Sequence, residues 1–225
     1  MPNPEPHSVL VTDFDGTITR HDFYELALSR MKRAALPDYW EQYASGRITH
    51  FEAMRGIFSH VRGPEERVRA IVGEMEPDPK LGGAVERLRR HGWEIVVVSA
   101  GCAWYIDQVL EGAGVKLEVH ASPGRYDPER GLQMELPAHS PYCSVESGID
   151  KEAAVREALL DGRRVAFAGN GPPDLAPSLL VDSSRRFARG WLAQELRRRR
   201  KPFRPFEQWS EIASALTAET AAQPR

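Results

Sequence analysis

Two aspartates separated by one residue follow an apolar, β-branched run near the N-terminus of the chain. Residues 9–12 are expected to form a buried strand, and Asp13 and Asp15 follow it directly, before Gly16. Because alternate side chains of a strand share a face, both carboxylates can point into one site while Phe14 turns away. Two carboxylates this close are costly unless a cation lies between them or one is protonated. A simple turn after a strand would explain the same residues without any chemistry.

Three other segments place polar side chains where predicted strands end or a helix begins. Ser99 closes a second apolar run, Lys151 opens a predicted helix, and Asn170 lies in a loop rich in glycine and proline after a third apolar run. Strands that alternate with helices predict a parallel sheet with helices on both faces. Ligands bind such sheets at the carboxyl ends of the strands, so Asp13, Ser99 and Asn170 are expected at one location.

The segment from Asp13 to Thr19 resembles the first motif of the haloacid dehalogenase-like (HAD) phosphatases. The second motif of that superfamily, a strand ending in serine or threonine, is matched by Ser99. The third, a lysine at a helix start, is matched by Lys151, and the spacing of the fourth is matched at residues 169–174. All four motifs occur in the family's order. The resemblance implies a hydrolase that acts on phosphate esters.

The resemblance also implies a role for each matched residue. Asp13 would be the nucleophile that forms an aspartyl-phosphate, Asp15 the general acid and base, and Lys151 the catalytic cation that offsets the negative charge of nucleophile and phosphate. The implied substrate-binding residues are Ser99, Ala100, Gly101 and Asp22. The implied ligands of a magnesium ion are Asp13, Asp15, Asn170 and Asp174.

One position departs from the family pattern. The fourth motif normally begins Gly-Asp, whereas this chain has Asn170 after Gly169. An amide oxygen can still bind magnesium, because hard cations accept neutral oxygen ligands. One negative charge beside the ion is lost, so weaker metal binding is expected.

The order of predicted elements implies a Rossmann-like α/β core with an inserted helical domain. Residues 1–19 and 79–225 are expected to form the HAD-like core, with a last helix over 192–200, and residues 20–78 a small helical cap. Turn signals are dense over 120–149, which predicts a hairpin and loop excursion near the site.

The helical insert after the first motif is typical of the phosphoserine-phosphatase-like branch of the superfamily. The segments around Asp13, 45–49 and 187–192 further resemble the phosphatases of methionine salvage, although Ala100 and the lone Cys143 depart from that group. Asp22 lies where phosphoserine phosphatases carry an acidic residue that meets the substrate amine, and it can equally cap a helix.

Composition excludes several other classes of function. The 225 residues carry a net charge of -2, which gives no general attraction to nucleic acid or to an anionic membrane. No run approaches the roughly 20 apolar residues of a membrane span, and no signal sequence is visible, so a cytoplasmic protein is expected; the oligomeric state stays open. The basic cluster 197–201 is interpreted as a solvated helix end, with anion binding as the alternative.

These observations favour a magnesium-dependent phosphatase of a small phosphorylated metabolite, with methionine salvage as one pathway. Phosphoserine-phosphatase-like activity and transfer of the phosphoryl group to an acceptor alcohol are alternatives. A degenerate protein that binds a phosphorylated ligand without turnover is a third, which Asn170 motivates. Trp104, His139 and Tyr142 are candidates for the rim of the site, although turn and packing roles explain them equally well.

Overall fold

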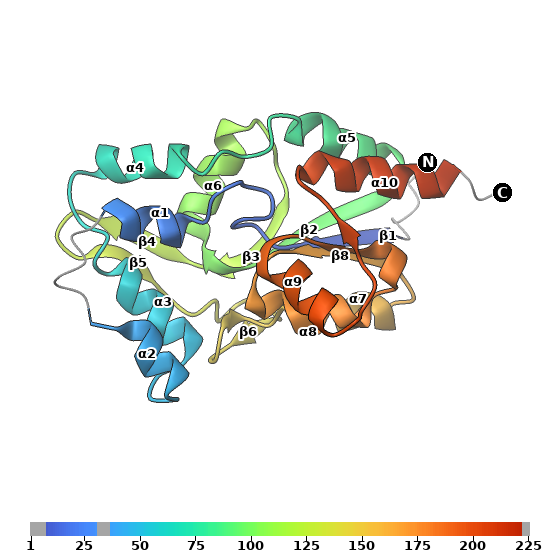
Figure 1. Ribbon diagram of the computed structural model, residues 1–225. Helices are drawn as coiled ribbons and strands as arrows, with labels where there is room; N and C mark the ends of the chain where they lie inside the picture. Colours follow the sequence, from blue (N-terminus) through green and yellow to red (C-terminus); the bar gives the residue numbers. More distant parts are fainter. Residues whose placement is uncertain (1–7, 31–36, 222–225) are drawn as a thin grey trace.

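The computed structural model describes residues 8–30 and 37–221 and is built around a six-stranded parallel sheet (Figure 1). The strand order is β10–β9–β8–β1–β2–β3. The strands are β1 (Ser8–Thr12), β2 (Trp93–Cys102), β3 (Glu118–Ser122), β8 (Arg164–Gly169), β9 (Arg186–Ala188) and β10 (Arg204–Pro205). The chain leaves β1 toward β2 and β3 and later returns to β8 on the other side. The strand order therefore reverses at β1, the place where open α/β sheets bind ligands.

Both faces of this sheet are buried, each against its own hydrophobic cluster. In β1, Leu10 belongs to one cluster, whereas Val9 and Val11 belong to the other. The same alternation recurs in β2, where Val97 and Val98 belong to different clusters. Strands covered on both faces need apolar residues at every position, which explains why they are so visible in the sequence.

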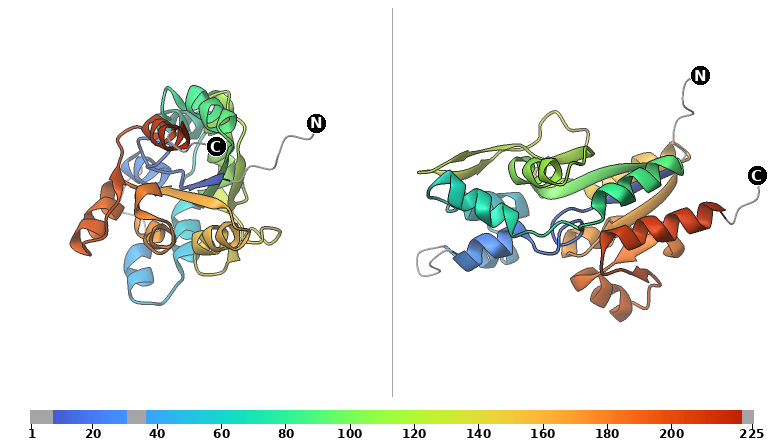
Figure 2. Two further views of the ribbon diagram at one scale, coloured as in Figure 1. Left: turned by 90° about the vertical axis from the view of Figure 1, so that its right-hand side faces the viewer. Right: turned by 90° about the horizontal axis from the view of Figure 1, so that it is seen from above.

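Helices cover the two faces as predicted (Figures 1 and 2). On the first face lie α5 (Leu81–Arg90), α6 (Ala103–Gly112) and α10 (Trp209–Ala221). On the second lie α7 (Lys151–Leu160), α8 (Leu175–Leu180) and α9 (Gly190–Arg198). The start of α7 is fixed by Asp150, whose side chain accepts a hydrogen bond from Ala153 N (2.9 Å). The expected α/β sheet with helices on both faces is confirmed.

Among the described residues, four helices lie between β1 and α5, beyond the carboxyl ends of the strands (Figure 1). They are α1 (Phe23–Arg30), α2 (Tyr39–Ala44), α3 (His50–Phe58) and α4 (Glu65–Gly73). Thr49 and Glu52 form a capping box at the start of α3. Phe23 and Phe58 belong to the same hydrophobic cluster as Tyr105 of α6, so the core runs without a break from these helices to the sheet. Their assignment to a separate cap domain over 20–78 stays a prediction.

Two small antiparallel hairpins form within residues 120–149. They are β4 (Gly124–Asp127) with β5 (Gly131–Met134), and β6 (Cys143–Ser144) with β7 (Gly148–Ile149). The first hairpin meets the loop after α3, where Gly63 N donates to Pro128 O (3.0 Å) and Tyr126 OH donates to Gly63 O (2.8 Å). The second meets the start of α3, where Phe51 N donates to Glu146 O (2.9 Å). The hairpins therefore join the α1–α4 region to the rest of the molecule.

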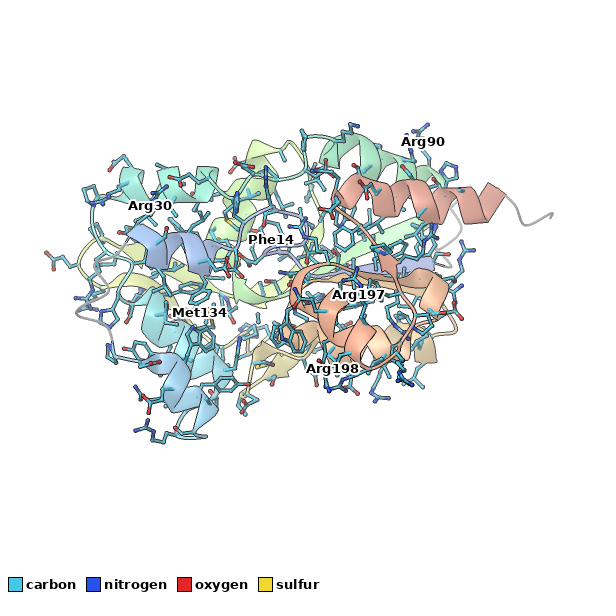
Figure 3. All side chains as sticks on the ribbon, viewed as in Figure 1. Phe14, Arg30, Arg90, Met134, Arg197 and Arg198 are labelled. Carbon is cyan, nitrogen blue, oxygen red and sulfur yellow. The ribbon has the colours of Figure 1, made fainter. Side chains whose placement is uncertain are left out.

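The C-terminal part and the end of β1 differ from expectation. The predicted helix over 192–200 corresponds to α9, but α10 follows it and packs on α5. Asp13 and Asp15 lie in the turn after β1 and not in the strand itself. Phe14, labelled in Figure 3, does turn away from the site, because its side chain is fully buried in the first cluster. None of the helices in the described residues combines the length and apolar character needed to cross a membrane.

Candidate active site

A cavity of about 820 Å³ opens at the carboxyl ends of the central strands. Its lining includes Asp13, Asp15, Ser99, Lys151 and Asn170, which come from four separate segments of the chain. The structure thus brings together the residues that sequence analysis expected at one location. The catalytic or binding role of each residue stays a prediction.

A buried lysine joins two aspartates at the polar end of this cavity. Lys151 Nζ donates to Asp13 Oδ1 (2.6 Å) and to Asp174 Oδ1 (2.7 Å), and the Lys151 side chain is only 5% exposed. Burial opposes the charged lysine, but the two carboxylates raise the pKa of Lys151 above its ordinary value. Burial and the neighbouring Asp174 carboxylate raise the pKa of Asp13 to about 7, although Lys151 opposes this rise. The negative charge at Asp13 is therefore only partly compensated.

Asp15 is held by one donor on each carboxylate oxygen. Phe23 N, at the start of α1, donates to Asp15 Oδ1 (3.0 Å), and Tyr105 OH of α6 donates to Asp15 Oδ2 (2.7 Å). Burial raises the pKa of Asp15, whereas these two hydrogen bonds lower it. The Tyr105 ring also stacks on Phe23, with ring centroids 4.4 Å apart. The carboxylate is thus oriented jointly by the α1–α4 region and the core.

Ser99 and Gly101 form the next part of the lining. Gly101 N donates to Ser99 Oγ (3.0 Å), and both residues line the cavity with Ala100. A Cβ atom at Gly101 would lie 1.9 Å from Tyr105 OH and 2.8 Å from Asp15 Oδ2. Sequence analysis attributed this glycine to a close approach of the backbone to phosphate. The structure adds a second reason, because the Tyr105–Asp15 hydrogen bond occupies the space of a side chain.

The fourth motif is a loop closed by its own aspartate. Asp174 Oδ2 accepts hydrogen bonds from Asn170 N (2.9 Å) and Gly171 N (2.8 Å), and a short 3-10 helix over Pro172–Asp174 ends the loop. A Cβ atom at Gly169 would lie 2.5 Å from Asp174 Cγ. With Lys151 on the other oxygen, the Asp174 carboxylate positions the loop and the lysine. These contacts account for the position of Asp174 without its predicted role as a metal ligand.

A magnesium ion fits the remaining oxygen atoms. Thr17 Oγ1 donates to Asn170 Oδ1 (2.9 Å) and lies 3.4 Å from Asp13 Oδ2, so these two oxygens border the same space. Among the described residues, no group of three or more His, Cys, Asp or Glu side chains is arranged to hold a metal. The family resemblance implies a site made of Asp13, the main-chain oxygen of Asp15 and the Asn170 amide, all of them ligands suited to a hard cation.

The charge balance of the polar end also suits a cation. Asp13, Asp15, Asp22 and Asp174 line the cavity, and Lys151 pairs with Asp13 and Asp174. Burial and the Asp15 carboxylate raise the pKa of Asp22 well above its ordinary value. Excess buried carboxylate favours protonation or cation binding. Asp22 also accepts a hydrogen bond from Tyr24 N (2.8 Å) at the start of α1, so the capping interpretation is observed, and its contact with substrate stays a prediction.

The other end of the cavity was not predicted from the sequence. We call it the aromatic wall: Tyr24 of α1, Trp40 and Tyr43 of α2, and His50 of α3. Ring centroids of Trp40 lie 5.3 Å from Tyr24, 6.0 Å from Tyr43 and 5.6 Å from His50. His50 was not among the residues predicted for the site. The only available signal was the concentration of aromatic residues between positions 39 and 43.

The residues that sequence analysis considered for the rim lie elsewhere. The described lining of the cavity contains none of Trp104, His139 and Tyr142. Trp104 packs against Tyr126 of the first hairpin, with ring centroids 5.3 Å apart. Tyr142 packs against His120 in a similar way. Packing explains these aromatic residues.

The basic cluster over 197–201 makes local contacts. Arg198 and Arg199 pair with Glu195 of the same helix (2.6 Å each), and the Arg197 guanidinium lies 5.3 Å from the ring centre of Phe203. Arg197 and Arg198 are labelled on α9 in Figure 3. These contacts agree with a solvated helix end.

Comparison with known proteins identifies the family. The model of the haloacid dehalogenase-like hydrolase family matches residues 10–176, which span β1, the four motifs and the helices between them. The chain belongs to this family. The matched range includes every residue of the polar end described above.

Individual relatives of this HAD hydrolase are distant. A Bacillus velezensis protein named 2-hydroxy-3-keto-5-methylthiopentenyl-1-phosphate phosphatase is 23% identical over 92% of this chain and 89% of its own length. A substrate-bound phosphoserine phosphatase structure matches with a TM-score of 0.62 at 15% identity, over 92% of this chain and 97% of that one. A phosphoserine phosphatase from T. onnurineus matches with a TM-score of 0.61 at 16% identity, over 99% and 98% of the two chains. At this identity the structures show a shared fold.

Proposed function

We propose that this HAD hydrolase is a magnesium-dependent phosphomonoesterase that acts on a small phosphorylated metabolite through an aspartyl-phosphate on Asp13. The observation that carries the proposal is the pairing of Asp13 with Lys151 beside a second carboxylate, Asp15, whose two oxygens are each fixed by a donor. A nucleophile, a cation and an oriented acid/base in one cavity are the groups that phosphoryl transfer requires.

The first chemical step is assigned to Asp13. The attacking atom is a carboxylate oxygen of Asp13, whose Oδ1 accepts a hydrogen bond from Lys151 and whose Oδ2 lies 3.4 Å from the Thr17 hydroxyl. Its bond to phosphorus forms as the bond from phosphorus to the alcohol oxygen breaks. Lys151 favours the ionised form of Asp13 against the effect of burial and offsets the charge of the approaching phosphate. Ser99 Oγ and the main-chain N–H of Ala100 are proposed to hold the phosphoryl oxygens.

Asp15 is assigned the proton transfers. Its raised pKa favours the protonated form that can give a proton to the leaving alcohol oxygen. The resulting carboxylate then takes a proton from water, whose oxygen attacks phosphorus and releases Asp13 and inorganic phosphate. The hydrogen bonds from Phe23 N and Tyr105 OH stabilise the ionised form and keep the carboxylate in one orientation.

The metal would be held by Asp13, the Asp15 main-chain oxygen and Asn170. When bound, it would supply positive charge that stabilises the transferring phosphoryl group. Asn170 provides one charge fewer than the aspartate usual in the family, so a modest magnesium affinity is part of the proposal.

Two named relatives suggest the substrate. The Bacillus velezensis relative carries the name of a methionine-salvage phosphatase and covers nearly the whole chain. Phosphoserine phosphatases share the fold. We propose the first kind of substrate ahead of the second, because the aromatic wall is better suited to an uncharged alcohol than to an amino acid.

The experiment that tests this function is phosphate release from a panel of phosphomonoesters, with and without magnesium. Turnover should need magnesium and should fall by at least about 10³-fold in Asp13→Asn, which keeps the shape of the side chain but removes the nucleophilic charge. Adding acceptor alcohols to the same reactions detects transfer to an acceptor in place of water. Circular dichroism of the variant serves as the folding control.

A second candidate is a protein that binds a phosphorylated ligand without turnover, and Asn170 is the residue that favours it. Folded, magnesium-loaded protein that releases no phosphate from any ester, yet binds phosphate in calorimetry, would establish this candidate and reject the phosphatase.

A further inference from the structure

The aromatic wall presents ring surface to the cavity. The indole N–H of Trp40 donates to the Tyr24 hydroxyl, so the polar edge of Trp40 is already engaged within the wall. Tyr43 is 38% exposed, and Met54 of α3 lines the same space. Exposed aromatic surface inside a cavity commonly marks a site for an apolar group.

His50 extends this wall as a neutral ring. Burial, together with the positive charge of Lys151, lowers the pKa of His50 below its ordinary value. Its Nδ1 atom is buried without a hydrogen-bond partner in the structure, while the ring packs edge to face against Tyr43 with centroids 5.5 Å apart. The imidazole therefore adds apolar contact and no cation.

The charges around the wall disfavour a negatively charged ligand. Glu25 and Glu146 line the same cavity as Asp22, and Lys151 is already bound to two carboxylates. Among the lining residues that the structure describes, none is an arginine. Asp22, Glu25 and Glu146 suit the ammonium group of phosphoserine but not its carboxylate. Within the described lining that carboxylate would meet like charges, with no cation other than Lys151, which is costly in a partly desolvated site.

We propose that the aromatic wall is the specificity subsite and that it binds the uncharged, apolar part of the alcohol. The preferred substrate is then a phosphomonoester with an apolar chain or ring a few bonds from phosphorus, and a carboxylate-bearing ester such as phosphoserine is rejected. This inference rests on the proposed phosphatase activity. To that activity it adds the kind of alcohol that the site accepts and the residues that determine this specificity.

Three esters test the proposal with magnesium-loaded wild-type protein. Ethyl phosphate and n-butyl phosphate have leaving alcohols of similar acidity, so a difference between them reports binding of the longer chain. The kcat/KM for n-butyl phosphate should exceed that for ethyl phosphate by about tenfold or more, mainly through KM. O-phospho-L-serine should be hydrolysed more slowly than n-butyl phosphate by a similar factor. Equal or faster turnover of O-phospho-L-serine would overturn the proposal while leaving the phosphatase intact.

Substitutions in the wall identify the residues responsible. Trp40→Ala should lower the kcat/KM for n-butyl phosphate more than that for ethyl phosphate, so that the preference for the longer chain is lost. Equal losses on both esters would mean that Trp40 has only a structural role and would overturn the assignment.

A second pair of variants tests the effect of charge by placing a cation in the wall. Tyr43→Arg should raise the kcat/KM for O-phospho-L-serine by about tenfold and lower that for n-butyl phosphate. Tyr43→Gln, the matched control, should lower the kcat/KM for n-butyl phosphate without raising that for O-phospho-L-serine. No gain in Tyr43→Arg, in protein that still hydrolyses ethyl phosphate, counts against the wall as the subsite. Absence of turnover on all three esters by the wild type would instead reject the phosphatase itself.

Discussion

The two ends of the cavity are built in different ways. At the polar end, Asp13, Asp15, Lys151 and Asp174 are buried, and the structure gives each of them at least one hydrogen-bond partner from a distant part of the chain. The aromatic wall comes from short helices and is held mainly by ring contacts. The polar end is therefore fixed by directional bonds, whereas the wall is held by packing. Under the proposal above, this difference separates the reaction from the choice of alcohol.

The largest effect is expected at the centre of the polar end. Lys151→Met leaves Asp13 and Asp174 buried without their shared cation, so the free energy of unfolding should fall by about 3–5 kcal/mol. Urea unfolding measures this loss. Adding Asp13→Asn to Lys151→Met should recover part of it, because one uncompensated carboxylate is removed. A strictly additive double variant would show that the lysine does not interact with Asp13 in solution.

A smaller effect is expected where the two regions meet at Asp15. Tyr105→Phe keeps the ring stacked on Phe23 and removes only the hydroxyl, so kcat should fall by about tenfold with little change in KM. The loss should shrink for p-nitrophenyl phosphate, whose leaving group needs no proton. If Tyr105 had only a structural role, kcat would fall equally for p-nitrophenyl phosphate and for an ester whose leaving alcohol needs a proton.

Gly101→Ala tests the same contact from the other side. The new methyl group would collide with the Tyr105 hydroxyl and must displace it, so the dependence on the leaving group should resemble that of Tyr105→Phe. In the double variant Gly101→Ala/Tyr105→Phe the shortest contact is removed, while Asp15 Oδ2 (2.8 Å) and Cζ of the ring (2.9 Å) stay close to the new methyl group. Its kcat should therefore be no lower than that of Gly101→Ala alone.

At the metal ligands, Asn170→Asp should strengthen magnesium binding by about tenfold, because a carboxylate replaces a neutral amide beside the ion. Calorimetric titration with magnesium chloride, without substrate, measures this directly. An unchanged affinity would mean that Asn170 already serves the ion as well as an aspartate does.

The smallest effect is expected for a substitution on the surface, away from both ends of the cavity. Arg198→Ala removes an exposed ion pair with Glu195 and should change the free energy of unfolding by less than about 1 kcal/mol. Phosphate release should be unchanged. A clear loss of activity would give the basic cluster a role in substrate attraction.

The polar end could be predicted from the sequence because its residues follow strong local signals. Asp13 and Ser99 come after buried strands whose apolar runs are unambiguous, and Lys151 follows a helix cap. The topology of a parallel sheet then brings such positions together whatever their distance along the chain. The sheet and its two layers of helices follow from the same pattern.

The aromatic wall lacked signals of this kind. Trp40 and Tyr43 are three residues apart on a six-residue helix, a spacing equally suited to packing on a core. Tyr105 gave no sign of its contact with Asp15, since a buried tyrosine on a helix is usual. The helix α10 did have a signal: Trp209, Ile212 and Leu216 recur at helical spacing and are buried.

The contacts of the two hairpins with the loop after α3 and the start of α3 have a consequence for hydrogen exchange. The amides of Phe51 and Gly63 donate to residues of the 120–149 segment, and Gly131 lies too close to the Ser59 carbonyl for any side chain. Opening of α3 must therefore break contacts made by a segment far away in sequence. We expect the amides of α3 and of the β4–β5 hairpin to lose protection together, as one cooperative unit, and ahead of those in β1 and β2.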